Sequence, residues 1–533
     1  MRRKKGLGRT ITSAMALLVL MAVLAACSGG GNAPSNEGAT GEGSNSVGNG
    51  ASDGAAEGSS EERVQLSWMV NGVVLEDSST EQFLEERFNV DLEITAVPYA
   101  DYVQRQQIMM TTGKVPDVMI VMDPNELKKY ADQGLLAEVP MEMIEQYAPR
   151  TKAEFDNNAP QGWYYTGHNG QNYGVPTLYG GKFTTPVSWR MDLLEQAGVT
   201  EVPETIEEMD TAFAALKDIG VYGTSTNGNS DYAMFQKIFG AYGVMPIQWM
   251  VKDGQVVNGA VQPEAKEALA KLADWYSKGY IDPEFVTGKD LGPKYLDGVY
   301  AFGDNASVHS LDESNPNSTI SALKAINPEG EVVFGTLPKG PNGDSGGWSW
   351  GTAANMIVFG AQLEDQPEKL QKALEIIEAN INDEEVYVRL SYGVQGTHWD
   401  FANGTDLSDG VKQLPPYDDS ARLQEEGIYG SANSYFGGKG NFELFYKYYG
   451  ENILKISEQY ASNPVADIFG KPDILPSAGQ YWGDLKKLKI ETYAKIVRGD
   501  EPVDYFDRFV EQWNQMGGEQ LRKEAQELYD SNN

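Results

Sequence analysis

Apolar and polar positions along the chain switch between two periods, and this predicts an α/β protein. Residues 64–70 alternate as in a strand and run into an Asn-Gly turn, while 91–97 and 116–122 are predicted as further strands. Between them, 79–88 has apolar residues at helical spacing, and 101–112 is predicted as a second helix. Strands that alternate with helices are typical of domains with largely parallel sheets.

The helical pattern continues through the rest of the chain and favours more than one domain. Further helices are predicted at 125–133, 263–278 and 367–380, and the remainder is helix-rich. At 533 residues the chain is too long for a single hydrophobic core, and 41% apolar residues are sufficient for globular domains.

The N-terminal segment has the composition of an export signal. Five basic residues within the first nine are followed by an apolar run over 14–26, shorter than the roughly 20 residues that span a bilayer. The run ends in Leu-Ala-Ala-Cys, which resembles the lipobox of bacterial lipoproteins. The resemblance implies that a signal peptide, residues 1–26, is removed and that Cys27 carries acyl chains such as palmitate. The alternative is an ordinary signal with a chance cysteine.

The next segment is predicted to be a tether. Residues 27–62 begin with the candidate lipidated cysteine and are then mostly Gly, Ser, Asn, Ala and acidic residues, which cannot bury enough surface to fold. A flexible coil of this length reaches roughly 30 Å. We therefore expect a domain that is held by its lipid at the extracytoplasmic face of the bacterial cell membrane.

The charge excludes some partners. The formal net charge is -35, and the signal contributes only basic residues, so the mature chain is more acidic still. Such a surface repels nucleic acid and anionic membranes. A strongly anionic small ligand is also disfavoured, although a local pocket could still take one.

Several short motifs follow one another in a fixed order. They are Gly-x-x-Pro-Asp from 113, Tyr-Gly-x-Pro from 173, Arg-x-Asp from 190 and Tyr-Gly-x-x-Gly-x-His from 392. Together they resemble bacterial extracellular solute-binding protein family 1, and within it the large lipoprotein branch similar to LplA. Gln395 and Trp399 depart from the Glu and Tyr of the last motif.

The resemblance implies a two-lobed periplasmic-binding-protein-like fold of type II, with a hinge between the lobes and a helix-rich C-terminal region. We expect lobe 1 to comprise 63–178 and 331–382, and lobe 2 to comprise 179–330 and 383–533. The strand at 332–340 is expected to return the chain to lobe 1.

The resemblance also implies a function. The expected protein is a monomeric, lipid-anchored receptor. It delivers a sugar or oligosaccharide to the permease subunits of an ABC importer as its cleft closes. A peptide or another nutrient is the alternative ligand. No cofactor and no metal is expected.

Candidate ligand-binding residues come from strand ends, the hinge and aromatic loops. Residues just beyond the carboxyl ends of strands suit a cleft rim, and exposed Trp in a Gly-rich loop suits binding. Trp68 could instead be core, and Asn71 could serve only its turn. The candidates are Trp68, Asn71, Asp123, Asn125, Tyr179, Trp348, Trp350, His398 and Trp399.

An extracellular enzyme, such as a glycosidase, is the competing class. It requires two carboxylates about 5 to 10 Å apart in a cleft, and 77 acidic residues do not exclude such a pair. The sequence has no Gly-x-Ser-x-Gly elbow and no His-Glu-x-x-His zinc motif, and its three histidines are widely spaced. We therefore assign no catalytic residue.

Overall fold

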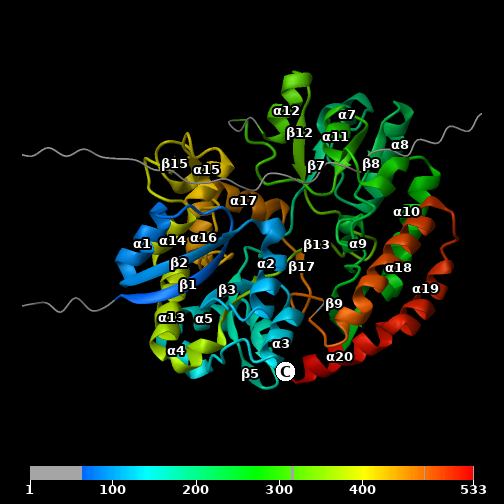
Figure 1. Ribbon diagram of the computed structural model, residues 1–533. Helices are drawn as coiled ribbons and strands as arrows, with labels where there is room; N and C mark the ends of the chain where they lie inside the picture. The colour runs from blue at the N-terminus through cyan, green and yellow to red at the C-terminus, as the bar shows by residue number, and fades with distance from the viewer. Residues whose placement is uncertain (1–62, 314–316, 473, 532–533) are drawn as a thin grey trace, which may run out of the picture. The chain divides into compact units, whose positions relative to one another are not determined.

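The computed structural model describes residues 63–313, 317–472 and 474–531 (Figure 1). The predicted signal peptide, Cys27 and the tether lie outside the described residues. Within the described part, no helix combines the length and the apolar character needed to cross a membrane.

The first sheet has five strands in the order β2-β1-β3-β14-β6. β1 pairs in parallel with both β2 and β3, and β14 is antiparallel to β3 and β6. The side chains of β3 are all buried, as expected for a central strand covered on both faces. The strands are β1 (Val64–Asn71), β2 (Val90–Val97), β3 (Val118–Val121), β6 (Gly174–Leu178) and β14 (Ala353–Phe359).

Helices that follow the strands of this sheet begin at polar caps. Ser78 caps α1, and Asp123 caps α3, where each side chain accepts a hydrogen bond from an N–H of the first turn. The helices packed around this sheet are α1 (Ser79–Phe88), α2 (Tyr99–Thr111), α3 (Pro124–Asp132), α4 (Met141–Tyr147), α5 (Pro149–Asn158), α6 (Trp163–Thr166), α13 (Pro367–Asn382) and α14 (Glu384–Ser391).

A short hairpin precedes β6. Its strands are β4 (Gly167–His168) and β5 (Gln171–Asn172), and the two residues between them, Asn169 and Gly170, both have positive φ. This is the backbone that a tight two-residue hairpin requires, and Asn-Gly is the pair that adopts it most readily.

The second sheet has four strands in the order β12-β7-β11-β8. They are β7 (Val187–Arg190), β8 (Tyr222–Thr224), β11 (Tyr300–Gly303) and β12 (Val332–Gly335). The prediction that the strand after 331 returns to the first lobe is wrong, because β12 pairs antiparallel with β7 over its whole length. The chain re-enters the first sheet only at β14.

Helices around the second sheet include one that begins with a capping box. The Thr205 side chain accepts from the N–H of Glu208, and the Glu208 carboxylate accepts from the N–H of Thr205, which fixes the start of α8. The helices are α7 (Met191–Gln196), α8 (Ile206–Asp218), α9 (Gln236–Ala241), α10 (Pro263–Ser277), α11 (Leu291–Leu296) and α12 (Thr319–Ile326).

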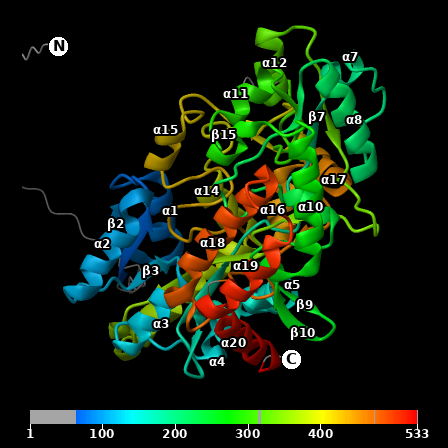
Figure 2. The same ribbon diagram turned by 90° about the vertical axis from the view of Figure 1, so that its right-hand side faces the viewer.

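C-terminal helices pack beside this region. Figure 2 shows α18 (Ala478–Arg498) next to α10 and α19 (Tyr505–Trp513), in agreement with their contacts, while α20 (Glu519–Asp530) lies against β10. The strands β9 (Trp249–Lys252) and β10 (Gln255–Asn258) form a hairpin. A hydrogen bond joins this hairpin to α20, because the side-chain oxygen of Gln526 accepts from the N–H of Val256.

The segment after α14 returns to the first sheet. The N–H of Asn71 donates to the carbonyl of Ser434, and Lys439 forms an isolated bridge with Leu178. This differs from the expected placement of all of 383–533 in the second lobe, and the lobe boundaries themselves stay a prediction. The remaining elements here are β15 (Trp399–Phe401), β16 (Val411–Gln413), α15 (Ser420–Glu425), α16 (Phe442–Tyr449), α17 (Glu451–Tyr460) and β17 (Pro464–Val465).

Candidate ligand-binding site

Three aromatic side chains from two distant segments form one surface cluster. Tyr232 stacks on Trp348 with ring centroids 4.6 Å apart, and Trp350 meets Trp348 edge-on at 4.4 Å. Tyr232 is 41% exposed and Trp350 is 55% exposed. We call Tyr232, Trp348 and Trp350 the aromatic platform. Rings of this kind present a large, rigid apolar face at little cost in conformational entropy.

The backbone of Trp348 is held from both sides. It lies in β13 (Gly347–Trp348), which pairs with β17. The Trp348 N–H donates to Oε1 of Gln236 at 2.9 Å, and its carbonyl accepts from the Thr184 hydroxyl at 2.8 Å. These bonds hold the backbone at Trp348, and the contacts with Tyr232 and Trp350 orient its ring.

A buried lysine lies behind this strand and interacts electrostatically with the buried Asp304. The Nζ of Lys237, a fully buried residue, donates to the Thr184 hydroxyl at 2.6 Å, so the lysine supports the bond from Thr184 to Trp348. Burial lowers the pKa of Lys237 to about 7, and the charge of Asp304 opposes this shift. Burial raises the pKa of Asp304 to about 7, against the effect of Lys237. Oδ2 of Asp304 has no hydrogen-bond partner within the described residues.

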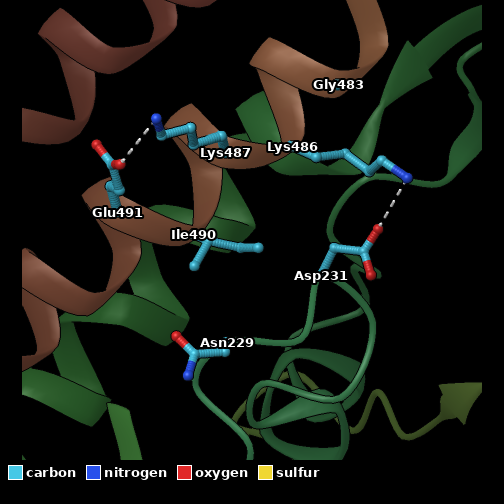
Figure 3. Close-up of a pocket in the computed structure, with 7 residues that line it drawn as sticks. All are labelled: Asn229, Asp231, Gly483, Lys486, Lys487, Ile490 and Glu491. Atoms are coloured by element: carbon cyan, nitrogen blue, oxygen red, sulfur yellow. Dashed lines mark ion pairs between the residues drawn. The ribbon is translucent and has the colours of Figure 1, made fainter. Parts of the chain in front are cut away.

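Helix α18 holds the loop that carries Tyr232. The Lys489 ammonium donates to the carbonyl of Asp231, and Lys486 pairs with the Asp231 carboxylate at 3.4 Å. Figure 3 shows the hollow beside this contact, where Asp231 points to Lys486 and Lys487 points to Glu491. The charges that line the hollow pair with one another, which is typical of a structural contact rather than of a ligand site.

The segment that follows β6 of the first sheet lies beside the loop that carries Trp350 and beside the segment that contains Lys439. The N–H of Tyr179 donates to the carbonyl of Thr352 at 2.8 Å, and the preceding residue, Leu178, pairs with Lys439. A Cβ at Gly181 would lie 1.7 Å from the carbonyl oxygen of Gly351, so only glycine permits this approach. Tyr179 itself is 40% exposed. Tyr179, a predicted ligand-binding residue, therefore lies beside the loop of the platform.

Polar groups gather where β1 ends. The Tyr429 hydroxyl donates to the carbonyl of Asn71 at 3.2 Å, and the Lys439 ammonium donates to the Ser431 hydroxyl. Oδ1 of Asn71 is enclosed and has no partner within the described residues. Asn71 thus stands at the carboxyl end of its strand, as expected, and it contacts the segment that also contains Lys439.

Three of the predicted residues are core residues. Trp68 is fully buried, its indole N–H donates to the carbonyl of Tyr435, and its ring meets Phe436 at 5.3 Å, so the core alternative for Trp68 is correct. His398 and Trp399 are each 3% exposed. Nδ1 of His398 accepts from the N–H of Val394, and Trp399 donates to the carbonyl of Gly393. These three side chains therefore present almost no surface that a ligand could contact.

Asp123 and Asn125 have a local role. The Asp123 carboxylate accepts from the N–H of Asn125 at 2.8 Å as the cap of α3. Asp123 is exposed beyond the end of β3, where the sequence placed it. A ligand contact for this pair stays a prediction.

Two residues of the candidate site, Tyr232 and Lys439, are not among those predicted from the sequence. Tyr232 comes two residues after the end of the polar stretch 223–230, and an aromatic residue so close to a polar loop is the signal that the sequence offers. Lys439 stands between Gly438 and Gly440, where a single long cation among glycines is equally visible. Neither of these sequence features shows which distant segment of the chain the Tyr232 or Lys439 side chain packs against.

No group of three or more His, Cys, Asp or Glu residues in the described part of the chain is arranged to hold a metal ion. Two of the three histidines have structural partners: His168 of the hairpin meets Asp132 of α3 at 2.7 Å, and Nδ1 of His398 accepts from the N–H of Val394.

The two-sheet α/β architecture, with a platform beside the connecting segment, defines a protein of the periplasmic-binding type. The sequence profile of the family described as bacterial extracellular solute-binding protein matches residues 71–357, and the chain belongs to this family. The expected family and fold class are therefore confirmed.

Individual relatives are distant but cover most of the chain. The polygalacturonan/rhamnogalacturonan-binding protein YtcQ of Bacillus subtilis (strain 168) is 23% identical, over 88% of this chain and 92% of YtcQ. Lipoprotein LipO of the same organism is 22% identical, over 84% of this chain and 88% of LipO. Among solved structures, the S. pneumoniae ABC-transporter substrate binding protein FusA in complex with kestose has 16% identity and a TM-score of 0.59, over 88% of this chain and all (100%) of that one.

Proposed function

We propose that the protein is a receptor that binds a sugar or oligosaccharide between its two domains and delivers it to an ABC importer. The observation that carries the proposal is the exposed aromatic platform, since flat rings suit the apolar faces of sugars. The polygalacturonan-binding relative and the kestose complex support the same class of ligand. Closure of the domains around the ligand would give the permease a distinct form to recognise.

The proposal extends to the anchor. A lipid on Cys27 would keep the receptor at the outer face of the membrane, and the lipoprotein relative supports this. Cys27→Ser should release the protein into the medium of the expressing cells. If the variant stays in the membrane fraction as fully as the unchanged protein, the lipid anchor is wrong.

Binding is tested by a thermal-shift screen of the mature chain against oligosaccharides and peptides. A ligand at 100 times its Kd should stabilise the protein by about 2.7 kcal/mol. The glycan is then recovered and examined by chromatography. A shift with unchanged glycan supports the receptor, a cleaved glycan indicates an enzyme, and a shift with peptides alone refutes the sugar assignment.

A further inference from the structure

Lys439 is a largely enclosed cation without an acidic partner. Its ammonium donates to the Ser431 hydroxyl and lies 5.1 Å from the centroid of the Phe445 ring. No ion pair involving Lys439 is formed within the part of the chain that the structure describes. Burial alone lowers its pKa to about 8, so it is still mainly protonated at neutral pH.

The other deeply buried lysines differ in this respect. The charge of Asp304 raises the pKa of Lys237 against the effect of burial, and the charge of Asp231 does the same for Lys489. A buried charge is costly unless an opposite charge or strong hydrogen bonds compensate it. For Lys439, the Ser431 hydroxyl and the Phe445 ring are the groups that compensate the charge. Because an ammonium has three N–H groups, Lys439 can still donate a further hydrogen bond.

The position of Lys439 relates it to the aromatic platform. Its N–H donates to the carbonyl of Leu178, and the N–H of the next residue, Tyr179, donates to Thr352, two residues beyond Trp350. Gly438 allows the close approach, since a Cβ there would lie 2.7 Å from Cβ of Thr177. The lysine and the platform thus lie on segments that flank the same short stretch of chain.

We propose that the ligand is an acidic sugar and that Lys439 binds its carboxylate. This rests on the proposed function and names its substrate class. The overall charge of -35 disfavours anions at the surface in general, so a selective receptor for an acidic sugar needs a local cation of this kind. The sugar ring stacks on the platform, and a charge-assisted hydrogen bond from Lys439 distinguishes the acid from its neutral analogue.

The test compares acidic and neutral forms of one ligand. Calorimetric titrations use trimers of galacturonate and of glucuronate, their methyl esters, and a neutral trimer such as kestose. The unchanged protein should bind a uronate more tightly than its ester. Lys439→Met should weaken uronate binding by roughly 10- to 100-fold, the range for a hydrogen bond to a charged group, and leave the ester within twofold.

Lys447→Met is the matched control. Lys447 lies on α16, pairs with Glu384 at 2.6 Å, and its loss changes the net charge by the same amount. Thermal unfolding shows whether each variant is folded, and Lys439→Gln repeats the test with a polar side chain. An equal loss in both Met variants would indicate long-range charge and overturn the role of Lys439.

The outcomes separate this inference from the proposed function. If neutral trimers bind, uronates do not, and Lys439→Met has no effect, the acidic-sugar inference is wrong and the sugar receptor stands. If no sugar in the thermal-shift panel or among these trimers binds, the proposed function fails and this inference fails with it.

Discussion

Trp350 provides the sharpest test of the aromatic platform. Its side chain is exposed, and its ring contacts are with Trp348 at 4.4 Å and Tyr232 at 5.6 Å. Trp350→Ala removes the most exposed ring of the platform without opening a cavity in the core. The change should therefore weaken ligand binding while the fold is kept.

The magnitude follows from the area that a ligand would cover. A Trp side chain has on the order of 250 Å² of surface, so an exposed fraction of 55% leaves about 140 Å² to cover. A sugar ring that covers half of this, about 70 Å², contributes about 1.7 kcal/mol at about 25 cal/mol per Å². Since 1.4 kcal/mol corresponds to a tenfold change, Trp350→Ala should raise the Kd by roughly 10- to 20-fold.

The assay is calorimetric titration with whichever oligosaccharide gives a thermal shift. Trp350→Phe keeps a smaller flat ring and should fall between the unchanged protein and the alanine variant. Trp163→Ala is the control, since Trp163 packs on Phe155 and donates to Asp156 instead of joining the platform. A Kd that stays within twofold for folded Trp350→Ala would refute the placement of the ligand on this surface.

Three further predictions follow from buried charges. Lys237→Met should lower the free energy of unfolding in denaturant by about 1–3 kcal/mol, because it removes the buried donor to Thr184 and the positive charge that favours the Asp304 carboxylate, and the double variant with Asp304→Asn should lose less; equal or additive losses would contradict the coupling. The buried Arg190 side chain donates two hydrogen bonds to the Asp192 carboxylate. Arg190→Lys should therefore lower the free energy of unfolding by about 1–3 kcal/mol without changing ligand affinity. A weaker affinity in the folded variant would show a binding role. Burial lowers the pKa of Lys439 in the folded state, so its contribution to stability is most favourable above the unfolded pKa and is lost as the pH falls through about 8. Lys439→Met should therefore gain stability relative to the unchanged protein as the pH is lowered from 10 to 7. A pH-independent difference between the two proteins in chemical denaturation would contradict this.

Some features of the fold follow from short stretches of sequence. The alternating residues of 64–70 form β1, and the apolar spacing of 79–88 forms α1 with the same bounds. The Thr205 and Glu208 pair forms its capping box, and Asn169-Gly170 forms the tight hairpin. These succeed because the hydrogen bonds and the backbone geometry involve residues close together in the chain.

Other features depend on which distant segments meet. Trp68 and Trp350 are both candidate ligand-binding residues in the sequence, yet residues 435 and 436 enclose Trp68, whereas Trp350 is open to solvent. Strand β12 has an apolar pattern that suits either sheet, and only its pairing with β7 decides the choice.

The sequence by itself determined the family, the α/β class and the local elements, since these depend on periodicity and on motifs that adjacent residues carry. The tertiary structure decided the site: it brought Tyr232 to Trp348, buried His398 and Trp399, and placed Lys439 against the segment that leaves the first sheet. The physical reason is that exposure and charge pairing belong to the packed neighbours of a residue, and those neighbours come from segments far apart in the chain.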